Sequence, residues 1–255
     1  MSTFWMTAQT AAARCGSDWR AFSLFGPVHL FWLGLALALC IGLGLWYRRA
    51  APRARRRMLV VLTILLLADE CFKYVVTLAT GQWNWSFLPL HLCSLNIFVC
   101  AANTVRPSAW LQEILYALCL PGALVALLSP SWQALPLCNA IHLHSSTIHI
   151  MLVLYPVLLL AGGFRPNPRR LPFVCGCLAA AAIPVFGINR LLGTNFMFLN
   201  GSDGNAITRL MAGVLGERFY ILGFLPVIAL LWAVLYLPWV LANRRAAAPR
   251  TKTHV

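Results

Sequence analysis

Residues 28–47 read VHLFWLGLALALCIGLGLWY, and residues 48–57 directly after them read RRAAPRARRR. The first stretch contains no Asp, Glu, Lys or Arg over 20 residues. A helix of that length spans about 30 Å, which matches the hydrocarbon core of a bilayer. An apolar segment that is closed by a cluster of arginines is typical of a membrane-spanning helix whose basic end stays in the cytoplasm.

Six further apolar segments follow, each bounded by Pro, Gly, Asn or charged residues. They are Met58 to Thr80, Leu88 to Val105, Leu111 to Leu128, His144 to Gly163, Pro172 to Leu192 and Phe219 to Leu241. The chain as a whole is 60% hydrophobic and only 10% charged, which is far below the roughly one quarter of charged residues in soluble domains. The sequence therefore predicts an all-α, polytopic membrane helix bundle with about seven transmembrane helices.

The distribution of lysine and arginine sets the expected orientation, because cytoplasmic loops are enriched in these residues. When alternate loops are placed on opposite sides, 14 of the 20 lysines and arginines fall on one side. That side is expected to be the cytoplasm, with the N-terminus outside and the C-terminus inside. The expected organisation is an extracytoplasmic segment over 1–27, a single transmembrane domain over 28–241 and a cytoplasmic polar tail over 242–255.

The formal net charge of +14 raises the question of nucleic-acid binding. Binding to phosphates requires a continuous basic face, whereas these cations lie in short segments between apolar runs. Topology accounts for the charge, so we expect membrane lipids rather than nucleic acid as partners. The oligomeric state is not indicated. Neither a cofactor nor a metal is expected, since the sequence lacks an H-x-x-x-H or H-E-x-x-H pair.

Two of the expected spans contain residues that are unusual in a transmembrane helix. The third contains Pro89, His91 and two asparagines, and the fourth contains Glu113 and a Pro121-Gly122 break, so either is expected to be kinked or re-entrant. The stretch 195–216 is expected to form an outer loop with a short amphipathic helix.

Ionisable residues inside the expected spans are candidates for a site, because a charge in the hydrocarbon needs a partner or a wet cavity. Asp69, Glu70 and Lys73 lie in the second span, where Lys73 can reach either carboxylate on the same helix. A self-neutralising pair and a binding site are equally good interpretations of this group.

A second group combines a thiol with imidazoles. Cys93 and His149 each lie about five residues inside the outer end of a span, so at 1.5 Å per residue both are about 7 Å deep. A thiol that an imidazole activates can attack an acyl carbonyl. In a purely structural alternative, the histidines only hydrogen-bond neighbouring helices. A metal site that includes His91 is a further alternative.

Five segments carry a resemblance to a known family: FGPVHLFWLG (25–34), FLPLHLCSLNIFV (87–99), HIMLVLYPVLLL (149–160), GTNFMFL (193–199) and RFYILGFLP (218–226). They resemble the YwaF-type family of bacterial integral membrane proteins, which implies a multi-pass protein of the bacterial cytoplasmic (inner) membrane. More remotely, the motif with Cys93 and the later His149-x5-Tyr155-Pro156 helix are similar to eukaryotic transmembrane acyltransferases that remodel ether phospholipids. In that group a cysteine and a histidine are thought to carry the transfer.

The favoured hypothesis is a lipid-directed acyltransferase with its site in the outer half of the bilayer. Cys93 is the expected nucleophile, His149 the general base and His91 an orienting residue. The expected substrate-binding residues are Lys73, Glu70, Asn96, Arg218 and Tyr220, with Lys73 or Arg218 on the lipid head group. Two alternatives remain: a carrier or receptor for a small polar solute or proton, in which Cys93 has no role, and a membrane scaffold.

Overall fold

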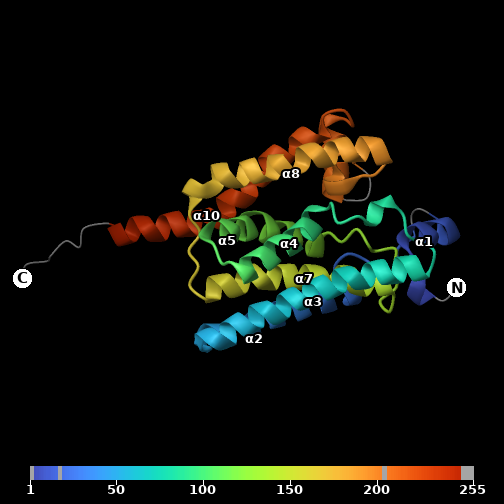
Figure 1. Ribbon diagram of the computed structural model, residues 1–255. Coiled ribbons are helices and arrows are strands. Elements are labelled where there is room, and N and C mark those ends of the chain that lie inside the picture. The colour runs from blue at the N-terminus through green and yellow to red at the C-terminus, as the bar shows by residue number, and fades with distance from the viewer. Residues whose placement is uncertain (1–2, 17–18, 203–205, 248–255) are drawn as a thin grey trace, which may run out of the picture.

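The computed structural model describes residues 3–16, 19–202 and 206–247. These residues form helices joined by turns and short loops (Figure 1). The α-helices are α1 (Ala8–Cys15), α2 (Pro27–Arg49), α3 (Pro52–Ala79), α4 (Leu92–Val105), α5 (Ala109–Ile114), α6 (Leu120–Leu128), α7 (Ala140–Ala161), α8 (Leu171–Leu192), α9 (Ala206–Leu215) and α10 (Phe224–Ala247). The expected all-α fold is confirmed.

Six helical segments of the described residues are long and apolar enough to cross a bilayer, so the chain is a polytopic membrane protein. They are Pro27–Arg49, Trp85–Val105, Ala109–Leu128, Ala140–Ala161, Pro168–Leu192 and Tyr220–Ala242. The remaining expected span falls on α3, a helix of 28 residues. This helix lies outside the group of six because Asp69, Glu70 and Lys73 interrupt its apolar sequence.

The long helices run side by side in layers (Figure 1). Helices α2, α3 and α7 lie on one side, α4 to α6 lie in the middle, and α8 and α10 cover the opposite side. Helix α7 packs against α2, α3, α4 and α6. Its side chains Leu152, Tyr155 and Leu158 are fully buried, so α7 is the central element of the core.

Two element boundaries differ from the sequence prediction. The second span was expected to begin at Met58, but α3 begins at Pro52. Proline suits the first position of a helix, and the arginines after it are good helix formers, so the helix extends into the basic segment. At the other end of the chain, α10 continues to Ala247, past the expected start of the tail at 242, and residues 248–255 lie outside the described residues.

The fourth span is irregular, as expected, but the irregularity precedes the Pro121-Gly122 pair. Residues Leu115–Cys119 form a π-helical turn between α5 and α6. Pro121 has no N–H to donate to the carbonyl of Ala117, four residues earlier. The indole N–H of Trp232 on α10 donates to that carbonyl instead, at 2.9 Å.

A buried carboxylate links three helices at the end of the bundle where α8 begins. Glu113 on α5 is fully buried and accepts hydrogen bonds from the hydroxyl of Tyr236 on α10 (2.6 Å) and from Arg170 at the start of α8 (3.2 Å). The backbone N–H of Asn167 adds a third bond, at 3.1 Å. A buried charge with this many donors is structural, because its desolvation is compensated locally.

Two histidines join helices through neutral partners. The Nδ1 of His29 accepts from the N–H of Phe25, so its Nε2 donates to the carbonyl of Leu127 at 2.7 Å. His142 on α7 accepts from the indole N–H of Trp32 on α2 at 2.9 Å, and its Nδ1 donates to the carbonyl of Leu135. Both histidines therefore have a structural role, which is to hydrogen-bond neighbouring segments.

Replacing His142 with phenylalanine is expected to lower the free energy of unfolding by about 1 to 3 kcal/mol, because it leaves the Trp32 donor and the Leu135 acceptor buried without partners. Unfolding by sodium dodecyl sulfate in mixed micelles measures the change. The double variant Trp32→Phe, His142→Phe is expected to lose less than the two single losses combined. An unchanged midpoint for His142→Phe would contradict this role.

Candidate functional site

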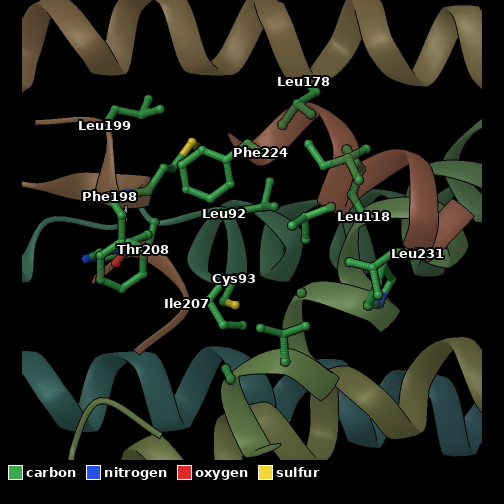
Figure 2. A pocket seen from close by; sticks show the side chains of 18 of the residues that line it. Leu92, Cys93, Leu118, Leu178, Phe198, Leu199, Ile207, Thr208, Phe224 and Leu231 are labelled. Carbon is green, nitrogen blue, oxygen red and sulfur yellow. Dashed lines mark hydrogen bonds between the residues drawn. The ribbon is translucent and has the colours of Figure 1, made fainter. Parts of the chain in front are cut away.

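A cavity of about 510 Å³ lies between the middle layer and the α8–α10 side of the bundle (Figure 2). Its walls come from α4, the π-helical turn, α6, α7, α8, α9, α10 and the loop after α8. Most of its lining side chains are leucine, isoleucine, valine, alanine, methionine or phenylalanine. Cys93, His91 and His149 are among the residues that line this cavity.

Cys93 is placed by the start of α4. The chain is extended at His91, which is the N-cap residue, and α4 begins at Leu92. Cys93 therefore lies in the first turn, as a free and half-buried cysteine. In Figure 2 it lies between Phe198 and Thr208 at one end of the cavity and the leucines Leu118 and Leu231 at the other.

His149 is held on α7 by a short hydrogen bond between its Nδ1 and the carbonyl oxygen of Ser145, at 2.6 Å. A carbonyl only accepts, so Nδ1 carries the hydrogen and the neutral ring keeps a lone pair on Nε2. The ring also stacks on Trp132, with centroids 5.1 Å apart. The two contacts fix both the orientation and the tautomer that a general base requires.

His91 has the opposite tautomer. Its Nδ1 accepts from the backbone N–H of Met197 at 3.3 Å, so the hydrogen of the neutral ring is on Nε2. The rings of Phe196 and Phe198 pack against the imidazole. His91 is therefore a hydrogen-bond donor through Nε2, whereas His149 is an acceptor.

The loop GTNFMFL supplies one wall of the cavity through Met197, Phe198 and Leu199. Asn189 at the end of α8 holds this loop, since its amide accepts from the N–H of Phe196 (2.8 Å) and donates to the carbonyl of the same residue (3.0 Å). These lining residues were not among the predicted site residues, although their segment carries the family resemblance.

Tyr220, a predicted substrate-binding residue, is buried and donates to the carbonyl of Phe198 at 2.7 Å. It supports the loop wall and does not line the cavity. Asn96 is also buried and donates to the carbonyl of Leu92 within α4, at 2.9 Å. Arg218 is exposed beside Phe219. The structure thus brings none of these three predicted residues to the cavity surface.

Glu70 and Lys73 belong to a separate charge cluster between α3 and α7, which we define as Asp69, Glu70, Lys73, His144 and Thr147. Lys73 and Glu70 form a buried ion pair. Asp69 accepts from the hydroxyl of Thr147 at 2.8 Å and lies 3.2 Å from Nδ1 of His144. No member of the charge cluster lines the cavity.

The described residues contain no group of three or more His, Cys, Asp and Glu side chains placed to hold a metal ion. The cavity instead presents a thiol, an imidazole acceptor and an imidazole donor in apolar surroundings. This set of groups suits nucleophilic attack on a carbonyl, with a base for the thiol proton and a donor for the carbonyl oxygen.

The family model described as the TMEM164 family matches residues 24–236, which is most of the chain and includes every residue of the cavity. No curated protein and no solved structure matches the chain.

Proposed function

We propose that the chain, which belongs to the TMEM164 family, is an acyltransferase that moves an acyl chain between membrane lipids through a thioester on Cys93. The observation that carries this proposal is that Cys93, His149 and His91 all line one apolar cavity. TMEM164 is linked to ether-lipid acyltransferase activity, which supports the same chemistry.

In the first half of the reaction, Nε2 of His149 takes the proton of the Cys93 thiol, and the thiolate attacks the ester carbonyl of a donor lipid. The bond from sulfur to the carbonyl carbon forms, and the ester C–O bond breaks. The imidazolium returns its proton to the leaving lysolipid oxygen. His91 donates through Nε2 to the carbonyl oxygen as negative charge develops there.

In the second half, the hydroxyl of an acceptor lysolipid attacks the thioester. Its proton passes to His149, the new C–O bond forms and the C–S bond breaks. The thiolate then takes the proton back from His149, so the enzyme returns to its starting state. The reaction is balanced, and it needs neither a cofactor nor an oxidant.

The proposal includes α3 as a seventh crossing, with the site in the outer half of the cytoplasmic membrane. The outward face of α3 is apolar, since Ile64, Val75 and Leu78 are each more than half exposed. Its ionisable residues Glu70 and Lys73 are turned inward and buried. This arrangement is typical of a transmembrane helix whose polar residues face the bundle.

The decisive experiment is lipidomics of a bacterial host that lacks the protein, complemented at equal membrane levels with wild type, Cys93→Ser or Cys40→Ser. Cys40 is a matched control because it is also a free and half-buried cysteine but does not line the cavity. Wild type and Cys40→Ser are expected to shift the acyl composition of a phospholipid class, and Cys93→Ser is expected to lose the shift. A Cys93→Ser protein that behaves like wild type would exclude the thioester.

The charge cluster favours a second candidate function, which is a carrier of a small polar solute or proton. Buried ionisable groups inside a bundle often mark ion pathways. In that case Asp69 and His144 would be essential and Cys93 dispensable, so the same complementation experiment separates the two functions.

A further inference from the structure

The inner end of the cavity lies near the bilayer midplane. Leu118, Leu178 and Leu231 line it, and each is near the middle residue of its own membrane-spanning segment. Cys93 lies closer to the outer helix ends, in the first turn of α4. The cavity therefore extends from the thiol toward the centre of the membrane, which is the direction of the acyl chains in the outer leaflet.

The wall between α8 and α10 gives this space a side toward the bilayer. Leu225 of α10 lines the cavity and is still 67% exposed, and Ala182 lines it from α8. An apolar chain can enter at this wall without crossing water. The occupant that fits such a space is a hydrocarbon chain, because burial of apolar groups is its main source of binding energy.

The irregular fourth span holds the inner end of the cavity, its floor, in place. Trp232 lines the cavity, and its indole N–H donates to the carbonyl of Ala117 in the π-helical turn. Ala117 and Leu118 of that turn are themselves lining residues. A π-helical turn therefore fixes one aromatic side chain at the floor, and such turns are frequent at functional sites.

We propose that this floor, formed by Leu118, Leu231 and Trp232, sets the length of the acyl chain that Cys93 accepts. The inference rests on the proposed function, since it names the substrate class of the same site. A chain that reaches the floor buries all of its methylenes, whereas a longer chain meets packed side chains that yield poorly. Two methylenes correspond to about a tenfold change in preference.

Leu231 and its neighbour Leu230 offer a matched pair of positions for the test. Leu231→Trp fills the floor, Leu231→Ala enlarges it, and Leu230→Trp places the same indole on the neighbouring residue, which is 66% exposed. Two quantities are measured. The first is the acyl chain length of the lipids that co-purify with each variant when Cys93 is also replaced with serine. The second is the rate of acyl transfer from donor phospholipids of graded chain length when Cys93 is unchanged.

Leu231→Trp is expected to shift both distributions to shorter chains, by about tenfold for each two methylenes. Leu231→Ala is expected to shift them to longer chains, and Leu230→Trp to leave them unchanged. Because the two Leu231 variants act in opposite directions, the failure of one to fold leaves the other as a test. Identical chain lengths in all variants would overturn the inference. Shifted bound lipids without any transfer by wild type would support the length-setting floor and overturn the acyltransferase.

Discussion

Replacing His149 with alanine is expected to slow acyl transfer by about two to four orders of magnitude, which is the usual contribution of a positioned general base. The lone pair on Nε2 is available because Nδ1 is committed to the Ser145 carbonyl, at 2.6 Å. Without the imidazole, the thiol of Cys93 must lose its proton in apolar surroundings, where the thiolate is poorly solvated.

The measurement is the rate at which the purified protein in lipid nanodiscs becomes acylated, followed by intact mass. His149→Ala is expected to acylate slowly, but to retain as much bound lipid as wild type. The control is His144→Gln, which changes a neighbouring histidine of α7 that does not line the cavity. A His149→Ala rate within about threefold of wild type would show that another group accepts the proton.

The sequence predicted the pairing of Cys93 with His149 because depth in a membrane can be counted. A rise of 1.5 Å per residue places residues of different spans on one scale, and two residues at equal depth can meet if their helices are neighbours. In the structure both residues line one cavity. Which helices are neighbours could not be predicted from the sequence, because helices that are apolar all round carry little information on which faces meet.

The other parts of the site depend on contacts between distant segments. Met197 and Phe198 reach the cavity because Asn189 and Tyr220 hold their loop from two different elements. The π-helical turn depends on Trp232, more than 100 residues away, which satisfies the carbonyl that Pro121 leaves free. Neither helix propensity nor hydropathy predicts such a contact between distant residues. The proline itself, however, predicted that the span is irregular.

The second large effect is expected in the charge cluster. Replacing Lys73 with methionine removes the nearer ion-pair partner of the buried Glu70 and leaves only Nε2 of His144, at 4.0 Å, within ion-pair distance among the described residues. This change is expected to lower the free energy of unfolding by about 3 to 5 kcal/mol. The double variant Lys73→Met, Glu70→Gln removes both charges and is expected to be close to wild type in stability, because neutral side chains of similar volume replace a buried ion pair without large loss. Unfolding by sodium dodecyl sulfate in mixed micelles measures both.

The double variant also decides between the two interpretations of Lys73, as half of a self-neutralising pair or as a ligand of the lipid head group. If the pair is only structural, the double variant regains acyl transfer along with stability. If Lys73 binds the head group, stability returns but transfer stays low, with a raised apparent KM for the donor lipid. We expect the first outcome, because the Lys73 ammonium is already bound to Glu70 and the charge cluster lies outside the cavity.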